Sequence, residues 1–279
     1  MRLDPVPAGT APALDDAAAA PPPDVANKTD LRAELADLGA RMAKLQAALY
    51  AESRRSVLVV LQARDTGGKD GAIRHVFGLL NPMGVEVTSF KAPTPLELSH
   101  DYLWRVHQRV PPRGMIGVFN RSHYEDVLVV RVHGLVSEEV WRARYDQINA
   151  FERHLAENGV TILKFCLHIS REEQRRRLMD RLRDPDKNWK FNPGDLEERE
   201  RWDGYTAAYG DALRLTSTVW APWYVVPADR KALRDVLIAE VVVETLERIN
   251  PRYPSAGEPV KQFLKLLEKE ATSDAGPRG

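Results

Sequence analysis

Residues 57–71 lead from an apolar strand directly into a glycine-rich turn that contains a lysine. The expected strand covers residues 57–61, and the turn includes Gly67, Gly68 and Lys69. Backbone amides around the two glycines can face an anion, Lys69 adds a mobile positive charge, and the helix that follows presents its positive N-terminal end. This arrangement demands a strand, a tight turn and a helix in succession, and it predicts a loop that binds polyphosphorylated ligands.

The loop departs from the usual phosphate-loop pattern G-x-x-x-x-G-K-[ST] at two positions. Ala63 stands where the first glycine belongs, and Asp70 replaces the hydroxyl residue that would hold magnesium. A hard cation prefers carboxylates, water and substrate phosphates over nitrogen ligands. Asp65 and Asp70 are therefore the first candidates for binding a metal in this loop.

The composition restricts where a polyanion could bind. The chain has 279 residues, 43% of them hydrophobic, which suffices for one large α/β domain or two small ones. Lys plus Arg and Asp plus Glu both number 40, so no net field attracts the molecule to nucleic acid or to an anionic membrane. Any polyanion must be bound by a local cluster of positive side chains.

The sequence also bears on location and redox chemistry. It has no apolar stretch of about 18 residues that could span a bilayer, and its start lacks the basic and apolar regions of a signal peptide. We therefore expect a cytoplasmic protein. Cys166, the only cysteine, lies in the apolar run 160–167, which favours a buried core residue over a nucleophile and leaves no disulfide within one chain.

Apolar runs with strand character alternate with helical segments. The runs cover residues 57–61, 85–90, 115–119, 160–167 and 223–226. The helical segments cover residues 72–80, 97–109, 138–158, 171–183, 195–213 and 231–248. This alternation predicts a mainly parallel sheet that helices cover on both faces. Ligands of such sheets gather beyond the carboxyl ends of the strands, where residues 65–71 and 120–126 both fall.

The two ends of the chain differ from its middle. Residues 1–28 are rich in Ala, Pro and Asp and lack periodic hydrophobicity, so we expect a disordered leader. We expect a single domain over residues 29–254 and a polar C-terminal tail over residues 255–279. An apolar stripe of helical spacing opens the domain, at Leu31, Leu35, Leu38, Met42, Leu45 and Leu49. It favours a helix packed on its own domain over a partner helix in an oligomer.

A second polar cluster, residues 120–126, follows the run 115–119. Asn120 stands where a conventional nucleotide-hydrolysing protein of this type places a magnesium-holding aspartate. Arg121 suits a bidentate grip on phosphate, while Glu125 and Asp126 could bind a metal or the ribose and base of a nucleotide. The alternative is a capped turn with a solvated charge cluster, and the position directly after a core strand favours the functional interpretation.

A third cluster is the arginine-rich segment 171–183, which Ser170 and Glu173 can start through a capping box. Its arginines exceed what the neighbouring carboxylates can balance: Arg171, Arg175, Arg176, Arg177, Arg181 and Arg183. Such a helix is usually a solvated face. Beside a phosphate loop, however, we interpret it as a lid that neutralises a transferring phosphoryl group. Residues 184–190 form a loop suited to moving over a substrate.

Taken together, these motifs resemble the polyphosphate kinase 2 family. The resemblance rests on Ala63-Arg-Asp-Thr-Gly-Gly-Lys-Asp-Gly71, Phe119-Asn-Arg-Ser-His-Tyr-Glu-Asp-Val127, the arginine helix, Trp189-Lys-Phe191, Trp202-Asp-Gly-Tyr205, Ser217-Thr-Val-Trp-Ala-Pro-Trp223 and Val226-Pro-Ala-Asp-Arg-Lys231. It implies a P-loop kinase-like three-layer α/β sandwich with a five-stranded sheet and a helical lid at about residues 170–200. It also implies magnesium-dependent, reversible transfer of the terminal phosphoryl group of inorganic polyphosphate to a nucleotide, with Mn²⁺ as a possible substitute for Mg²⁺.

The resemblance also implies roles for individual residues. Asp65 would organise magnesium and the acceptor phosphate together with Asp195, Lys69 would bind phosphate, and Arg121 and Arg181 would bracket the transferring group. Further phosphate-binding candidates are Thr66, Gly67, Gly68, Asp70, Gly71, Arg175 and Arg177. The nucleotide-binding candidates are Asn120, Glu125 and Asp126. The motifs are most similar to the branch that phosphorylates both AMP and ADP, although Thr66-Gly67 replaces the more usual Ala-Ala pair and Ala232 a frequent aromatic residue.

Two other functions stay open from the sequence. One is an ATP-dependent nucleoside or nucleotide kinase, which would share the sheet and the loop. The other is a module that binds nucleotide or polyphosphate without transfer, because Ala63, Asp70 and Asn120 depart from standard positions. We expect no nucleic-acid partner, because the basic charge is confined to one helix without interleaved aromatic residues. We expect no membrane partner either, and assembly as a homo-oligomer, a dimer or a tetramer.

Overall fold

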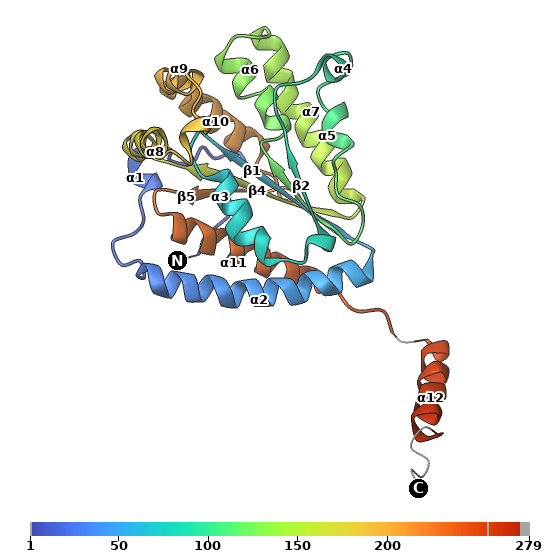
Figure 1. Cartoon of the computed structure of the whole chain (residues 1–279). Helices are drawn as coiled ribbons and strands as arrows, with labels where there is room; N and C mark the ends of the chain where they lie inside the picture. The colour runs from blue at the N-terminus through green and yellow to red at the C-terminus, as the bar shows by residue number, and fades with distance from the viewer. Residues whose placement is uncertain (1, 256, 274–279) are drawn as a thin grey trace.

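A parallel sheet forms the centre of the protein in a computed structural model that describes residues 2–255 and 257–273 (Figure 1). Its five strands are β1 (Ser56–Ala63), β2 (Val85–Ser89), β3 (Ile116–Asn120), β4 (Val160–His168) and β5 (Trp223–Pro227). They lie in the order β2-β3-β1-β4-β5, and every neighbouring pair is parallel. The predicted α/β architecture is confirmed, and each predicted strand agrees with an observed strand to within two residues at either end.

Strand β1 is buried on both faces between β3 and β4. Val59 and Leu61 belong to the hydrophobic core on one face of the sheet, while Leu58 and Val60 belong to the core on the other. Because both faces are covered, the strand has no polar alternation and reads as a continuous apolar run. This burial explains why the sequence pattern located the strand so closely.

Helices cover both faces of the sheet (Figure 1). The helices are α1 (Asp16–Ala19), α2 (Lys28–Glu52), α3 (Lys69–Val76), α4 (Pro95–Leu98), α5 (Trp104–His107), α6 (Val129–Val132), α7 (Glu138–Glu157), α8 (Arg171–Arg183), α9 (Gly194–Glu200), α10 (Trp202–Thr216), α11 (Lys231–Ile249) and α12 (Glu258–Ser273). Short 3-10 turns lie at Phe77–Leu79, Pro82–Gly84, His123–Asp126 and Asn188–Lys190. The core of one face contains residues of α2, α3 and α11, and the core of the other contains residues of α7 and α10.

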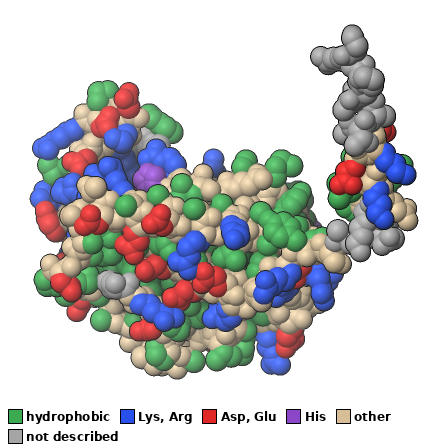
Figure 2. All heavy atoms as spheres, turned by 90° about the horizontal axis from the view of Figure 1, so that it is seen from below, with side chains coloured by type: hydrophobic (Ala, Val, Ile, Leu, Met, Phe, Trp, Pro, Cys, Tyr) green, Lys and Arg blue, Asp and Glu red, His purple; other side chains and the backbone are tan. Residues whose placement is uncertain are grey.

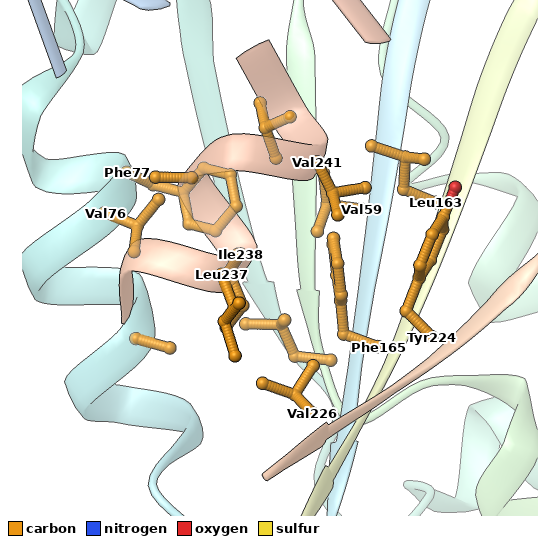
Figure 3. Packing of buried hydrophobic residues seen from close by; sticks show 14 of the residues in the cluster. Val59, Val76, Phe77, Leu163, Phe165, Tyr224, Val226, Leu237, Ile238 and Val241 are labelled. Carbon is orange, nitrogen blue, oxygen red and sulfur yellow. The ribbon is translucent and has the colours of Figure 1, made fainter. Parts of the chain in front are cut away.

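The apolar stripe of α2 packs within its own domain. Leu31, Leu38, Met42 and Leu49 are buried in the same core as the apolar face of α11, which agrees with the favoured interpretation of this stripe. Figure 3 shows the next layer of this core, where side chains of α3 and α11 pack against the strand residues Val59 and Phe165. The sheet and these helices form the rigid support of the strand ends.

Two predicted helices are interrupted. The helix predicted over residues 97–109 is wrong in its middle, because the chain turns between α4 and α5, where the Asp101 carboxylate accepts a hydrogen bond from the Leu103 amide. The helix predicted over residues 195–213 is divided at Arg201 into α9 and α10. In both segments the helical hydrophobic pattern is continuous, and local hydrogen bonds and packing decide where the backbone turns.

The structure of residues 2–28 differs from the disordered leader predicted over residues 1–28. Met1 lies outside the described residues. Leu3, Val6 and Ala19 are buried. The Val6 amide donates to the Trp223 carbonyl at 2.8 Å, and the Ala19 carbonyl accepts from the Asp229 amide at 3.3 Å. The segment therefore packs beside β5. Its order comes from contacts with residues more than 200 positions away, which a local composition cannot indicate.

The C-terminal segment also differs from the predicted polar tail. Within residues 255–279, α12 projects from the rest of the chain (Figure 1), and Val260, Phe263, Leu264, Leu266 and Leu267 are exposed on it. Residues 256 and 274–279 of the predicted tail lie outside the described residues. On the face seen from below, positive and negative side chains are interspersed (Figure 2), in agreement with the balanced composition.

A buried charge network supports the turn that follows β3. Lys164 of β4 is fully buried and donates hydrogen bonds to Glu152 Oε2 at 2.5 Å, to the Tyr124 hydroxyl at 2.8 Å and to the Thr216 carbonyl at 2.7 Å. Glu152 Oε1 also lies 3.2 Å from His123 Nε2. Burial alone would raise the pKa of Glu152, but the charge of Lys164 and the hydrogen bond with His123 hold it below its ordinary value. The network therefore ties residues 123 and 124 to α7 and β4.

We expect Glu152→Gln to lower the free energy of unfolding by about 3–5 kcal/mol, because the substitution leaves the Lys164 charge buried without a counter-ion. Urea denaturation at neutral pH measures this change. The matched control is Glu157→Gln on the same helix, where Glu157 is 60% exposed and pairs with Arg153. The control should cost less than about 1 kcal/mol. Equal losses for the two variants would contradict a supporting role of the network.

Candidate active site

The turn between β1 and α3 has the shape of a phosphate-binding loop. Thr66 and Gly68 adopt left-handed φ angles of +59° and +103°. A Cβ atom on Gly67 would lie 2.6 Å from the Ala63 Cβ and 2.9 Å from the Arg64 carbonyl oxygen, so only glycine fits there. The amides of this tight turn precede the N-terminus of α3, as the sequence predicted.

The Lys69 side chain folds back over the loop. Its Nζ donates a hydrogen bond to the Ala63 carbonyl at 2.9 Å, and the residue is buried. Burial lowers the pKa of Lys69, and the positive charge of Arg121 adds to this shift, whereas Asp65 and Glu125 oppose it. The ammonium group is thus part of a dense cluster of charges at the carboxyl ends of β1 and β3.

The residue after β3 joins the two strand ends. Arg121 Nη2 donates to Asp65 Oδ1 at 2.9 Å, and Arg121 Nη1 donates to Glu125 Oε2 at 3.2 Å. Burial disfavours the guanidinium charge, but Glu125 and Asp65 hold the pKa of Arg121 above its ordinary value. Arg121 has a φ angle of +63°, and its amide donates to the Leu61 carbonyl. The backbone is strained locally so that the side chain faces the phosphate loop.

The two remaining predicted nucleotide-binding residues have different surroundings. Asn120 Nδ2 donates to Asp70 Oδ1 at 2.9 Å, so both side chains face the phosphate loop. Asp126 accepts from Arg144 Nη1 at 3.3 Å, and burial raises its pKa against the influence of that arginine. Asp126 lines neither of the two cavities described below. The sequence does not indicate that Asp126 and Glu125 have different roles, because only the 3-10 turn decides that these adjacent side chains point in different directions.

The arginines of α8 fall into three groups. Arg181 Nη1 donates to Asp195 Oδ2 at 3.1 Å and lines the space above the phosphate loop. Arg177 is buried, and it donates to the Thr66 carbonyl at 3.0 Å and to the Asp229 carbonyl at 3.1 Å. Arg175 pairs with Glu172 on the exposed face. The structure therefore brings Arg181 and Arg177 to the loop and leaves Arg175 in solvent.

A cavity of about 660 Å³ opens over the phosphate loop, and we call it the cationic cavity. Nine lysines and arginines and only three aspartates line it: Lys69, Arg74, Lys91, Arg121, Arg177, Arg181, Lys187, Lys231 and Arg234, with Asp65, Asp70 and Asp180. A concave surface with this excess of positive charge concentrates anions, because its walls focus the electrostatic field. The cavity therefore has the local excess of positive charge that binding a polyanion to a chain of balanced composition would require.

A second cavity, of about 260 Å³, lies on the other side of Asp65 and Arg121, and we call it the aromatic cavity. Trp202, Tyr205 and Tyr209 of α10 line it. Four carboxylates also line it, against two arginines: Asp65, Glu125, Asp195 and Glu198, with Arg64 and Arg121. It therefore differs from the cationic cavity in both shape and charge.

One wall of the aromatic cavity is rigid. The Arg64 guanidinium stacks on the Trp202 ring with its central carbon 3.9 Å from the ring centroid, and it also donates a hydrogen bond to the Thr206 hydroxyl. The Tyr205 hydroxyl donates to Glu198 Oε2 at 2.5 Å. The sequence analysis quoted Trp202 and Tyr205 as part of a motif without giving them a role. Their spacing of one helical turn was the available signal.

Two carboxylates at the junction of the cavities could hold a divalent cation. Asp65 and Asp195 both line the aromatic cavity. Burial raises the pKa of Asp195, and the negative charge of Asp65 raises it further, so the two carboxylates lie close enough to repel each other. The described residues contain no group of three or more His, Cys, Asp or Glu side chains that could hold a metal ion. Any cation here would therefore need further oxygen ligands from substrate phosphates and water.

The structure adds one buried cation that the sequence analysis did not select. Arg234 of α11 is 1% exposed and lies against the phosphate loop, where a Cβ atom on Gly68 would approach its Nη1 to 2.0 Å. The available signal was an Arg-Asp pair in the first turn of a helix, just before the apolar run 236–239. No helix among the described residues is long and apolar enough to cross a bilayer.

Comparison with known proteins agrees with this geometry. A model of the polyphosphate kinase 2 family matches residues 25–254. The AMP/ADP-polyphosphate phosphotransferase of Meiothermus ruber is 59% identical over 220 residues, which are 79% of this chain and 82% of the relative. The ADP-polyphosphate phosphotransferase of Rhodopseudomonas palustris is 49% identical over 226 residues, which are 77% of this chain and 78% of the relative.

A solved structure shares the fold over almost the whole chain. The crystal structure of polyphosphate kinase 2 from Arthrobacter aurescens superposes with a TM-score of 0.86 and 40% sequence identity, and the match covers 95% of this chain and 99% of that chain. The family-model match over residues 25–254 includes the sheet, the phosphate loop and the arginine-rich helix. This chain therefore belongs to the polyphosphate kinase 2 family.

Proposed function

We propose that this chain transfers the terminal phosphoryl group of inorganic polyphosphate to ADP and to AMP, in a reversible reaction. The names of the two relatives above support this proposal. The single observation that carries it is the meeting of two unlike cavities at Asp65 and Arg121, which line both. A transfer between two large anions requires two binding sites that open onto one reacting position.

The cationic cavity suits the phosphate chain. Inorganic polyphosphate carries about one negative charge on each phosphate and no base or sugar, so it requires positive side chains and backbone amides. The cavity provides both, from the loop residues Thr66, Gly67 and Gly68 and from the surrounding lysines and arginines. Lys69 and Arg181 line it beside the point where the two cavities meet.

The aromatic cavity suits the nucleotide. Tyr205 and Tyr209 offer apolar faces to a base, and aromatic stacking on a base contributes about 1–3 kcal/mol. Four carboxylates around it would repel a long polyphosphate chain. A nucleotide would avoid the same repulsion only if its phosphates point toward Arg121 and a bound cation. This orientation would present the terminal phosphate of AMP or ADP to the end of the donor chain.

Kinases of this family are generally metal-dependent, and we infer that Mg²⁺, or Mn²⁺ in its place, binds to Asp65 and Asp195. When bound, the cation would neutralise phosphate oxygens of donor and acceptor. The acceptor phosphate has a second pKa of about 6 and is mostly ionised at neutral pH, so the reaction needs no strong general base. The remaining requirement is positioning and charge neutralisation, which Lys69, Arg121 and Arg181 can supply.

The direct test offers purified protein, Mg²⁺ and long-chain polyphosphate to ADP or AMP in the absence of ATP, and follows the nucleotides by chromatography. We expect ATP from ADP, and ADP followed by ATP from AMP. No product with either acceptor would overturn the proposal. Product formation from ATP alone as donor would support an ATP-dependent kinase instead. Cytoplasmic residence and a dimer or tetramer remain predictions of the sequence.

We expect Lys69→Ala and Asp65→Ala each to lower kcat/KM by about 10³ or more, because each removes a charge that faces the transferring group. Steady-state rates with polyphosphate and ADP measure this loss. The matched control is Lys44→Ala, which removes an exposed lysine of α2. Circular dichroism should show an unchanged fold for all three variants. Substantial activity in either site variant would refute the assignment.

We expect Tyr205→Leu to raise the KM for ADP about tenfold, because a lost stacking contact of about 1.4 kcal/mol corresponds to that factor. The KM for polyphosphate should stay unchanged. Tyr253→Leu, at an exposed position outside both cavities, is the control. A rise in the KM for polyphosphate with an unchanged KM for ADP would mean that the aromatic cavity takes the donor.

A further inference from the structure

Arg234 is a buried charge in the first turn of α11, just before the apolar run 236–239. Its side chain is 1% exposed, and its Nε and Nη2 atoms donate to Asp235 Oδ1 at 2.8 Å and 2.5 Å. A guanidinium presents five N–H donors in a planar fork. The carboxylate therefore fixes the plane of the group through one edge and leaves Nη1 directed elsewhere.

A chain of hydrogen bonds connects Arg234 to α3, the helix that follows the phosphate loop. Asp235 Oδ2 lies 2.9 Å from His75 Nδ1, and His75 Nε2 lies 3.1 Å from Arg74 Nη2. An arginine can only donate, so His75 Nε2 accepts and Nδ1 carries the proton. The chain holds Asp235, and through it Arg234, in a fixed position relative to the loop.

The guanidinium of Arg234 lies directly against the turn of the phosphate loop. A Cβ atom on Gly68 would be 2.0 Å from Arg234 Nη1, and one on Gly71 would be 3.1 Å from Nη2. Position 68 therefore requires glycine for close approach as well as for its φ angle of +103°, and Gly71 lies in tight contact with the same guanidinium. Arg234 also lines the cationic cavity. The structure accordingly presents a charged group at the floor of that cavity.

Arg234 Nη1 has no hydrogen-bond partner among the described residues. Arg177, whose Nη1 lies 3.5 Å from the same Gly68 Cβ position, is different. Its N–H groups donate to Glu173 and to the carbonyls of Thr66, Ala228 and Asp229. Arg234 Nη1 is not one of the buried side-chain atoms that lack a partner among the described residues, and Arg234 lines the cationic cavity, so Nη1 is open to that cavity. Arg177 therefore braces the loop, whereas Arg234 keeps a donor for a ligand.

We propose that Arg234 is a binding residue for the phosphate donor, with its Nη1 donating a hydrogen bond to an oxygen of the phosphate chain in the cationic cavity. This inference rests on the proposed function, because it assigns the donor to that cavity. Lysine cannot replace arginine here, since a single ammonium group cannot hold the Asp235 contact and reach the Nη1 position at once. Arg234 should thus affect the donor and not the acceptor.

The test compares the wild-type protein with Arg234→Lys and with Arg248→Lys. Arg248 lies on the same helix and contacts only Thr245 among its described hydrogen bonds. Isothermal calorimetry with sodium tripolyphosphate and Mg²⁺ should give a Kd about tenfold higher for Arg234→Lys and an unchanged Kd for Arg248→Lys. The Arg234 variant loses one charge-assisted hydrogen bond to the phosphate chain, and a tenfold change corresponds to about 1.4 kcal/mol. In steady-state assays the KM for polyphosphate should rise while the KM for ADP stays constant.

Several outcomes would overturn the inference. An unchanged tripolyphosphate Kd in Arg234→Lys would do so, as would equal rises in the KM values for polyphosphate and ADP. Absence of tripolyphosphate binding to the wild-type protein would also contradict it. If the wild-type protein forms ATP and Arg234→Lys keeps the wild-type Kd and KM values, the inference is refuted and the proposed function stands. If the wild-type protein binds tripolyphosphate but forms no ATP, the proposed function alone is refuted.

A measurement on the wild-type protein covers the case in which Arg234→Lys does not fold. Crystals grown with tripolyphosphate and Mg²⁺ should show a phosphate oxygen about 3 Å from Arg234 Nη1. A bound chain whose oxygens all lie beyond hydrogen-bond distance of Nη1 would contradict the inference, because Nη1 would then contact no part of the donor.

Discussion

The site depends on the burial of β1 between two parallel strands. Leu61 of β1 is paired with Asn120 of β3, so the two strands end at the same edge of the sheet. The Arg121 amide then donates to the Leu61 carbonyl, and its side chain reaches Asp65. Parallel pairing therefore joins two segments that are almost sixty residues apart in the sequence. Without it, neither cavity would have its shared wall.

Buried charges hold the loops at that edge in place. On one face of the sheet, Lys164 and Glu152 support the turn that carries Arg121 and Glu125. On the other side of the phosphate loop, Arg177 and Arg234 pack against its backbone. Carboxylates or carbonyls accept hydrogen bonds from each of these cations. The exception is Arg234 Nη1, which faces the cationic cavity. Such networks fix geometry more than they add stability.

Much of the fold and part of the site could be predicted from the sequence. The phosphate loop, the five strands and the bounds of α8 follow from local patterns, because a strand buried on both faces and a capped helix have strong local signals. Asp65, Lys69, Arg121, Arg181 and Asp195 all lie at the junction of the cavities or beside it. Asp126 and Arg175 do not, because the direction of a side chain depends on the turn and on its neighbours.

The sequence by itself determined the order of strands and helices, the phosphate loop and the family, since these depend on residue type and short spacing. Only the tertiary structure decided which charges meet. It divided the polar residues between a cationic and an aromatic cavity, ordered the residues before α2 against β5, and brought Arg234 to the phosphate loop across more than 160 positions of chain. The physical reason is that contacts between distant segments depend on packing and burial, which no local pattern records.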